Sequence, residues 1–404
     1  MLKTNMAKAV LYKTKLIYLN NFFLSLTFLV LIFGEITRIS LPGFGSVRIL
    51  DITVIFTVLS SFFVFPKAIF SAWPVRLFSL FVVVNIISLI FAYFSINTQI
   101  SVGIVHFGRL VLYFLLYPSI VLFFRKYSII KLHKLVVVVG SAVAAIGLLQ
   151  LILVPDIAFL TPYGWDPHRN RLVSSWLDPN FLSPFLVVCL SILITQFDRK
   201  NNPKINKLGQ IGLLFLLILA NLLTFSRSGL ICIAIFVILI GIRYYRRVLA
   251  AIIIGFALII TLYAPARQRV TGIINPDITA NARLISWVES VQIGLINPII
   301  GIGYNNYSVY KIENDKIEQK NSSFGADSTI LLIFATTGIL GSVLFFGVFI
   351  YSIIRSLLSK RKNLYILGSG LMGVLAASNF NNIMLYPLMI PVLMLVIASI
   401  NEDN

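Results

Sequence analysis

Apolar residues form long runs along the whole chain, and short polar or basic segments separate these runs. An α-helix needs about 17 to 25 mostly apolar residues to cross the ~30 Å hydrocarbon layer of a membrane. A hydropathy window of about 19 residues predicts about twelve such helices. They lie near residues 16–34, 48–66, 76–95, 103–124, 134–154, 181–196, 208–225, 228–243, 247–264, 328–354, 364–380 and 383–400. The pattern predicts an all-α, polytopic integral membrane protein whose residues 1–404 form a single transmembrane domain.

The composition strengthens this prediction, because 58% of the residues are hydrophobic, only 12% are charged and the mean hydropathy is +0.95. Soluble proteins carry about 25% charged residues, so an ordinary cytosolic enzyme is excluded. The net charge of +19 would suggest a nucleic-acid partner for a soluble domain. Here the positions of the charges indicate membrane topology, and we expect the lipid bilayer, rather than nucleic acid, as the partner.

The basic residues predict the orientation of the chain. With a cytoplasmic N-terminus, 21 of the 33 Lys and Arg residues lie in inner segments, as the positive-inside rule expects. They are Lys3, Lys8, Lys13, Lys15, Lys67, Arg76, Arg125, Lys126, Lys131, Lys134, Arg199, Lys200, Lys204, Lys207, Arg243, Arg246, Arg247, Arg355, Lys360, Arg361 and Lys362. Both termini are then cytoplasmic, and the two long loops, 155–180 and 265–327, lie on the outer face. Long loops in a compact protein are often functional, so we look for the site on that face.

Polar residues in or beside a membrane span are costly, and each needs a partner or a task. His106 and Arg109 are spaced i and i+3 on one face of the fourth predicted helix, near its outer end. Arg109 either extends to lipid headgroups or faces an internal cavity and holds an anion.

The first long loop ends in the segment 169–180, which contains Arg171 and leads into Asp178, Pro179 and Asn180. A capping carboxylate followed by proline is typical of a helix start, and this is the simpler interpretation of Asp178. Capping does not account for Arg171.

A tight hairpin at 224–229 places Arg227 at the outer boundary, where Ser226 or Ser228 can cap the following helix. Exposed N–H groups of a helix start favour anions, and a guanidinium suits a phosphate because it forms paired hydrogen bonds. Arg227 is alternatively an interfacial anchor.

The second long loop contains Arg283 within a stretch where Leu284, Trp287, Val288 and Val291 share one face, which predicts a short amphipathic helix on the membrane. Gly301 and Gly303 predict a turn after it. Asp327 stands immediately before the next span, either as its cap or as an outer-face carboxylate that takes a proton from an alcohol.

The order of these motifs resembles the O-antigen polymerase and O-antigen ligase superfamily. The resemblance rests on Asp178-Pro179-Asn180, on Phe225-Ser226-Arg227-Ser228-Gly229, on Arg283 with Trp287, on Pro298-Ile299-Ile300-Gly301-Ile302-Gly303, and on Asp327-Ser328 leading to Gly338-Ile339-Leu340-Gly341. It covers residues 171 to 341, and the first 100 residues contribute only hydropathy. Ligases of the superfamily usually carry a histidine before the span that follows the large loop, where this chain has Asp327. The resemblance therefore favours a polymerase.

The resemblance implies an enzyme of the bacterial cytoplasmic membrane that acts on undecaprenyl-pyrophosphate-linked oligosaccharides at the outer face, with no metal or other cofactor. An acceptor hydroxyl would displace the pyrophosphate from the anomeric carbon of the donor sugar in an O-antigen or capsule pathway. A chain-length regulator is a further partner that the resemblance implies. Arg227 and Arg283 are the first candidates for the pyrophosphate, followed by Arg171 and Arg109. Asp327 is the leading candidate base.

The sequence offers further candidates for bases and for substrate-binding residues. His106 and His168 are alternative bases, and His106, Asp178, Asn180 and Tyr304 are candidate substrate-binding residues. Aromatic residues at the outer boundary could stack on sugar rings or anchor the chain at the interface: Tyr163, Trp165, Trp176, Tyr304 and Tyr307.

Two other functions fit part of the pattern. A ligase that transfers glycan to lipid A core or another acceptor would use the same arginines. A flippase or other transporter of lipid-linked glycan would place polar residues near the bilayer midplane, whereas here they gather at the outer helix ends.

Overall fold

The computed structural model describes residues 2–41, 45–65, 72–96, 101–197, 207–262, 278–315 and 325–402. The helices are α1 (Leu2–Val30), α2 (Ile49–Phe62), α3 (Trp73–Phe91), α4 (Ser101–Phe114), α5 (Leu116–Lys126), α6 (Ile129–Leu153), α7 (Pro179–Phe197), α8 (Lys207–Leu223), α9 (Arg227–Tyr244), α10 (Arg246–Leu262), α12 (Ile278–Ile296), α13 (Tyr307–Asp315), α14 (Thr329–Leu358), α15 (Lys362–Ala377) and α16 (Ile390–Asn401). A hairpin of β1 (Ile39–Leu41) and β2 (Gly45–Val47) joins α1 to α2. The predicted all-α class is confirmed.

The number of membrane spans differs from the prediction. Within the described ranges, six helical stretches are long and apolar enough to cross a membrane: Trp73–Phe94, Gly103–Lys126, Ile129–Leu153, Pro179–Phe197, Arg227–Tyr244 and Thr329–Leu358. Four shorter apolar helices accompany them, at Thr14–Val30, Ile49–Phe62, Lys207–Leu223 and Ile390–Asn401. The protein is a membrane protein on this evidence, and the predicted twelve spans are not confirmed.

The run predicted as one helix over 103–124 consists of α4 and α5, which meet at Leu115. Pro118 lies three residues beyond this junction. A proline ring clashes with the carbonyl four residues before it and leaves that carbonyl without its N–H donor. The carbonyl concerned here belongs to Phe114, the last residue of α4, so the proline accounts for the break.

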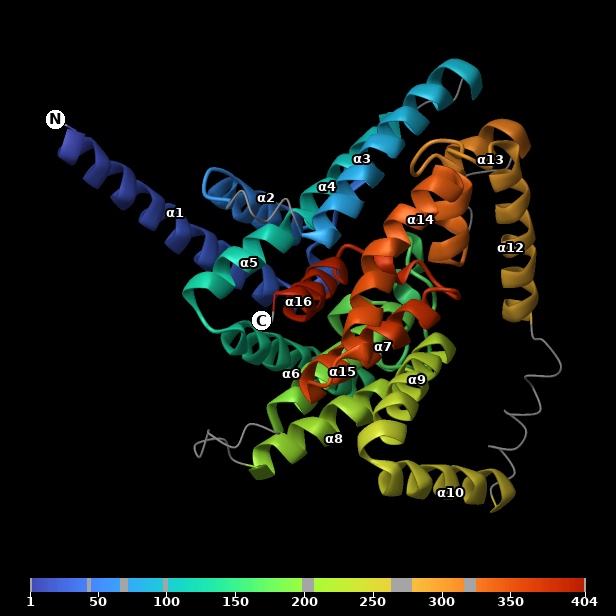
Figure 1. Ribbon diagram of the computed structural model, residues 1–404. Coiled ribbons are helices and arrows are strands. Elements are labelled where there is room, and N and C mark those ends of the chain that lie inside the picture. Colours follow the sequence, from blue (N-terminus) through green and yellow to red (C-terminus); the bar gives the residue numbers. More distant parts are fainter. Residues whose placement is uncertain are drawn as a thin grey trace.

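The centre of the molecule is formed by α7, α15 and α16, and α15 packs against α7, α9 and α14 (Figure 1). All residues of α16 are buried. Small residues permit the close approach of α15: a Cβ at Gly373 would lie 2.5 Å from the carbonyl oxygen of Cys232, and one at Gly370 would lie 2.9 Å from the Ser191 side chain. Such contacts are typical of helix packing in membranes, where small side chains let backbones approach.

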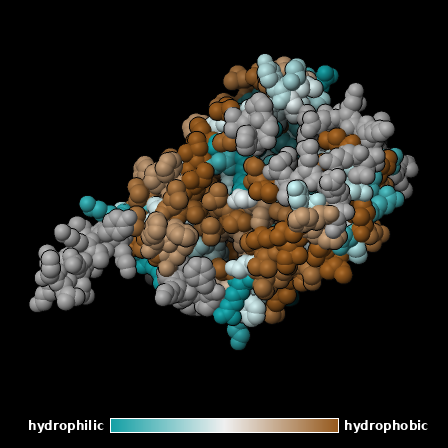
Figure 2. All heavy atoms as spheres, turned by 90° about the horizontal axis from the view of Figure 1, so that it is seen from above, coloured by the Kyte–Doolittle hydropathy of each residue, from teal (hydrophilic) through white to brown (hydrophobic). Residues whose placement is uncertain are grey.

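Apolar side chains also cover much of the outside. Exposed Ile, Leu and Phe residues occur on α2, α3, α8, α10, α12 and α14, and Figure 2 shows hydrophobic atoms extending over much of one face, with hydrophilic atoms mainly at its margins. Monomeric soluble proteins rarely expose contiguous apolar patches beyond a few hundred Å². The surface therefore suits a hydrocarbon environment.

The predicted amphipathic helix at 281–291 is part of the longer α12, which lies beside α14 (Figure 1). A Cβ at Gly294 would lie 2.4 Å from the Phe334 ring, so this glycine brings α12 close to α14. Residues 263–277 and 316–324 of the predicted outer loop lie outside the described residues.

Candidate active site

The end of the first long loop is fastened to two helix starts by Arg171. Its Nε donates to the carbonyl oxygen of Thr224 at 2.9 Å, and its Nη2 lies 3.4 Å from both Asn180 Oδ1 and the Phe225 carbonyl oxygen. The Leu172 N–H donates to the Leu223 carbonyl oxygen at 3.0 Å. These bonds place the loop against the start of α7 and the α8–α9 hairpin.

Two of the predicted caps are confirmed. Asp178 accepts a hydrogen bond from the Asn180 N–H at 2.7 Å at the start of α7. Ser226 accepts one from the Gly229 N–H at 3.1 Å and caps α9. Ser226 Oγ also donates to Asn180 Oδ1 at 3.0 Å, so Asn180 connects the α7 start both to Arg171 and to the hairpin.

The hairpin also connects to the loop after α15. Asn381 Nδ2 donates to Ser228 Oγ at 3.0 Å, and the Asn381 carbonyl oxygen accepts from Thr329 Oγ1 at 3.1 Å. Through this asparagine, the start of α9 and the start of α14 are held at one end of the helix bundle. Asn381 was not among the site residues predicted from the sequence.

Three arginines from different parts of the chain act on one another at this end. Burial lowers the pKa of Arg171, the positive charges of Arg283 and Arg227 lower it further, and Asp178 acts in the opposite direction. We call Arg171, Arg227 and Arg283 the arginine cluster. Guanidinium groups that repel one another favour binding of an anion among them, because the anion relieves the repulsion.

Asp327 adjoins the arginine cluster and does not cap α14. The cap is Ser328, whose Oγ accepts from the Leu331 N–H at 3.3 Å. The Asp327 backbone is held by α12, because its N–H donates to Ser286 Oγ at 3.3 Å and its carbonyl oxygen accepts from Trp287 Nε1 at 3.4 Å. The capping interpretation of Asp327 is therefore wrong, and capping does not occupy its carboxylate.

The electrostatic surroundings of Asp327 suit proton transfer. Burial raises its pKa, the charge of Arg283 lowers it, and the charge of Asp166 raises it, with a net increase over the ordinary value. A general base works best when its pKa lies close to the working pH. The carboxyl of Asp178, at the start of α7, has its pKa raised to about 6 by burial.

His168 lies beside Arg171, with its Nδ1 3.5 Å from Arg171 Nη1. Burial, followed by the charge of Arg171, lowers the pKa of His168 to about 4. The ring is thus neutral at physiological pH and could accept a proton, although its lowered pKa makes it a weaker base than an ordinary histidine.

The glycine motifs after α12 have a structural explanation. Gly301 has φ +74° and Gly338, inside α14, has φ +65°, and a Cβ at either would lie 2.3 Å from backbone atoms of the other segment. The two segments share hydrogen bonds, from the Ile339 N–H to the Pro298 carbonyl oxygen at 2.8 Å and from the Ile302 N–H to the Ala335 carbonyl oxygen at 3.1 Å. The predicted turn is confirmed, and it is locked against a kink in α14.

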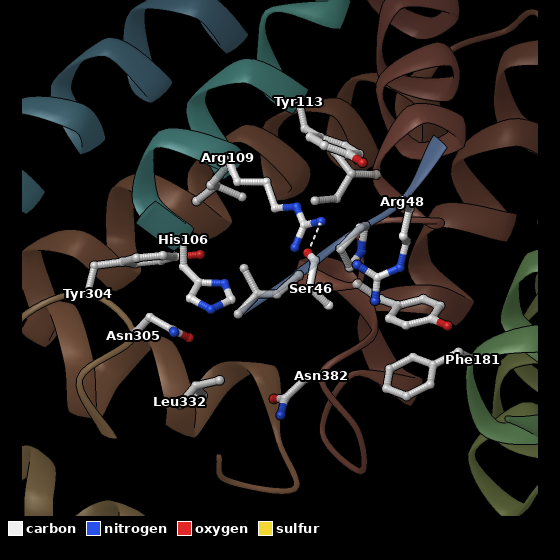
Figure 3. Close-up of a pocket in the computed structure, with 15 residues that line it drawn as sticks. Ser46, Arg48, His106, Arg109, Tyr113, Phe181, Tyr304, Asn305, Leu332 and Asn382 are labelled. Carbon is white, nitrogen blue, oxygen red and sulfur yellow. Dashed lines mark hydrogen bonds between the residues drawn. The ribbon is translucent and has the colours of Figure 1, made fainter. Parts of the chain in front are cut away.

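This turn delivers Tyr304 to a cavity of about 340 Å³ (Figure 3). His106 and Arg109 of α4 line the same cavity, together with residues from β2, α7, α14, α16 and the loop before α16. Its lining residues are Ser46, Arg48, His106, Arg109, Leu110, Tyr113, Phe181, Tyr304, Asn305, Leu332, Asn382, Leu385, Tyr386, Pro387 and Ile390. The predicted site residues therefore form two groups, one at the arginine cluster and one at this cavity.

Arg109 has a partner within the protein. It forms an ion pair with Asp51, and its Nη2 donates to the Ser46 carbonyl oxygen at 2.8 Å. Tyr113 OH donates to Asp51 Oδ1 at 2.8 Å. The predicted position of Arg109 at an internal cavity is confirmed, and the anion that its guanidinium holds is a carboxylate of the protein itself.

Sequence reasoning missed the second arginine of the cavity, Arg48. Its Nε donates to Glu35 Oε1 at 2.9 Å, and the side chain is 7% exposed. Glu35 and Asp51 are acidic residues at the ends of apolar runs, and intramembrane acidic residues call for a partner. That signal was available in the sequence, although the identity of each partner was not.

The aromatic candidates divide by burial. Trp176 is fully buried and donates from Nε1 to the Leu31 carbonyl oxygen at 3.1 Å, and Tyr307 is 2% exposed. Both the stacking and the interface-anchor interpretations of these two residues are wrong, because they belong to the core. Tyr163 is 79% exposed, whereas Tyr304 lines the cavity.

Comparison with known proteins bears on the part of the chain that carries most of the arginine cluster. No curated protein matches the chain. Residues 212–346, which include Arg227, Arg283 and Asp327, match the family model described as O-antigen ligase, and this match confirms the resemblance to the O-antigen polymerase and O-antigen ligase superfamily.

Proposed function

We propose that this protein is an O-antigen or capsular polysaccharide polymerase. It joins undecaprenyl-pyrophosphate-linked repeat units by glycosyl transfer at the outer face of the bacterial cytoplasmic membrane. The observation that carries the proposal is the convergence of Arg171, Arg227 and Arg283 beside a carboxylate, Asp327, that does not serve as a helix cap.

The arginine cluster binds the leaving group in this proposal. The pyrophosphate gains negative charge as its bond to the sugar breaks, and guanidinium groups already in place stabilise that charge in the transition state. Arginine suits this task because its planar fork makes two parallel hydrogen bonds to a phosphate. No metal ion is required for this stabilisation.

Asp327 acts as the general base. It takes the proton of the acceptor hydroxyl as the hydroxyl oxygen attacks the anomeric carbon of the donor sugar. The bond from that carbon to the pyrophosphate oxygen breaks, and undecaprenyl pyrophosphate leaves with the bonding electron pair. A single displacement of this kind inverts the configuration at the anomeric carbon.

The family match alone does not separate a polymerase from a ligase, which transfers glycan to lipid A core or another acceptor. The aspartate at position 327, where ligases of the superfamily usually have histidine, favours the polymerase. A flippase is less well supported, because the polar groups described above gather at helix ends.

The proposal is tested by a gel of surface and lipid-linked glycan from a strain that lacks the protein, with and without the restored gene. A polymerase predicts that long chains vanish while single repeat units still reach their acceptor. Polymer that accumulates on the carrier would indicate a ligase, and repeat units trapped at the inner face would indicate a flippase. An unchanged profile would refute a role in glycan assembly.

A further inference from the structure

The cavity lined by His106, Arg109 and Tyr304 has the chemistry of a sugar-binding site. We propose that it is the acceptor subsite, which binds the sugar residue that carries the attacking hydroxyl. This inference rests on the proposed function and adds to it the group that the cavity recognises.

The charges in the cavity wall argue against a second pyrophosphate. Its two guanidinium groups are each occupied, Arg48 by Glu35 and Arg109 by Asp51. A buried pyrophosphate needs unpaired positive charge to offset the loss of its hydration. A neutral, polyhydroxylated ligand needs hydrogen-bond donors and acceptors instead.

Such donors and acceptors remain available. Arg48 is 6% exposed, yet its Nη1 has no hydrogen-bond partner among the described residues, and the same holds for Asn382 Oδ1. Figure 3 shows the side chains of Asn305, Asn382 and His106 around the same space. An unmet buried donor costs about 1–3 kcal/mol, and a sugar hydroxyl, which both donates and accepts, can meet such groups.

Aromatic rings supply the other half of the recognition. Phe181, Tyr304 and Tyr386 line the cavity together with Leu332. A sugar ring presents apolar C–H faces as well as hydroxyls, and an apolar pocket with a few polar groups is the usual form of a small-molecule site. The volume of about 340 Å³ falls at the lower end for ligand pockets, which suits one sugar residue better than a whole repeat unit.

The cavity connects to the proposed base through Asn382. Its Nδ2 donates to the carbonyl oxygen of Ala326 at 2.7 Å, and Ala326 precedes Asp327. Phe181 likewise follows Asn180, which contacts Arg171. In an inverting displacement the acceptor approaches from the side opposite the leaving pyrophosphate, so the acceptor must lie away from the arginine cluster and close to the base. None of the three arginines of the cluster lines the cavity, whereas Asn382, which does, is bonded to the residue before Asp327.

Two variants and one control test the subsite in purified protein in lipid nanodiscs. Leu332→Trp fills the cavity, and His106→Ala removes one of its polar groups. Leu340→Trp is the matched control, because Leu340 is on the same helix and is 47% exposed. The probes are undecaprenyl pyrophosphate without sugar and the free repeat-unit oligosaccharide released from its carrier.

We expect Leu332→Trp to abolish binding of the oligosaccharide and to leave the Kd of undecaprenyl pyrophosphate unchanged. In transfer from lipid-linked repeat units to labelled oligosaccharide, His106→Ala should raise the KM of the oligosaccharide about tenfold, a loss near that of one hydrogen bond. The kcat of this variant and its KM for the lipid-linked donor should stay within about twofold of the wild-type values, because His106 does not contact the donor in this proposal. The control should behave as the wild type.

Three results would overturn the inference: a weaker affinity of Leu332→Trp for undecaprenyl pyrophosphate, a rise in the donor KM of His106→Ala in place of the oligosaccharide KM, or oligosaccharide binding that neither variant changes. A wild type that binds undecaprenyl pyrophosphate and no oligosaccharide would refute the subsite and leave the proposed function standing. A wild type that binds neither probe would refute both.

Discussion

The neighbouring residues Asp327 and Ser328 should have separable roles, one in chemistry and one in stability. Ser328 Oγ accepts from the Leu331 N–H and caps α14, whereas the Asp327 carboxylate does not form the cap. Asp327→Asn keeps the size and shape of the side chain and removes its ability to take a proton. Ser328→Ala removes the cap and leaves the carboxylate in place.

The two substitutions should change different quantities, the reaction rate for Asp327→Asn and the free energy of unfolding for Ser328→Ala. Loss of a general base costs about 10²- to 10⁴-fold in rate, which corresponds to about 3 to 5 kcal/mol in the activation barrier. Loss of a serine cap costs about 0.5 to 2 kcal/mol of stability, and the hydrogen bond of 3.3 Å to Leu331 places Ser328 toward the lower end. The backbone bonds of Asp327 to Ser286 and Trp287 are unaffected by either change.

The assay measures initial rates of chain extension by purified protein in nanodiscs, with lipid-linked repeat units as substrate, and the melting temperature of the same samples. Asp327→Asn should lose nearly all activity at an unchanged melting temperature. Ser328→Ala should retain its activity at 25 °C and melt slightly lower, because about 1 kcal/mol shifts the midpoint of a large chain by only a few degrees. Activity of Asp327→Asn within threefold of the wild type would refute its role as the base, since even the smallest expected loss is about a hundredfold.

Three more changes test the surroundings of the site. Arg227→Lys and Arg283→Lys should each reduce transfer at least about tenfold, because lysine keeps the charge and loses the paired hydrogen bonds; wild-type rates in both would contradict a pyrophosphate contact. Asp166→Asn removes a charge that raises the pKa of Asp327. Since the base acts when deprotonated, activity is lost as pH falls through that pKa, and the acid limb of the pH–rate profile should move to lower pH; an unmoved acid limb would contradict the contact between the two carboxylates. Gly338→Ala should destabilise the protein by more than about 1 kcal/mol in a denaturation assay, because its φ of +65° and the 2.3 Å approach of neighbouring backbone leave no room for a Cβ; an unchanged midpoint would contradict the packing of this kink.

Hydropathy predicted the helices well, because the backbone N–H and C=O groups of an apolar run in a membrane have to be paired within a helix. The break between α4 and α5 was also readable from Pro118, although the apolar run alone conceals it. The number of true spans was not readable, because a helix such as α16 is as apolar as a span and yet has only 12 residues, all buried by its neighbours.

The arginine cluster was predictable for a physical reason. Arg171 and Arg227 precede or begin apolar helices that topology assigns to one face, so the approximate depth of each follows from sequence. The choice between Asp327 and Ser328 as cap was not predictable, because it depends on backbone angles. Ser328 has the extended φ and ψ of a cap residue, −160° and 123°.

The cavity could not be predicted from the sequence, because its wall contains ion pairs between residues that are separated in the sequence. Asp51 and Arg109 are 58 residues apart, and Arg48 and Glu35 are 13 apart. Sequence shows that such charges need partners, whereas which partner each finds is decided by how α2 and α4 pack. His106 and Tyr304 were selected as binding candidates, and only the folded chain brings them to one cavity.

The central claim is that this protein forms a glycosidic bond at the expense of a sugar–pyrophosphate bond. The most direct measurement incubates the purified protein with lipid-linked repeat units alone and counts two products, linked repeat units and free undecaprenyl pyrophosphate. We predict one released carrier for each new linkage, in the wild type and not in Asp327→Asn. Folded wild-type protein that lengthens no chain, or a release of carrier that does not depend on Asp327, would contradict the account.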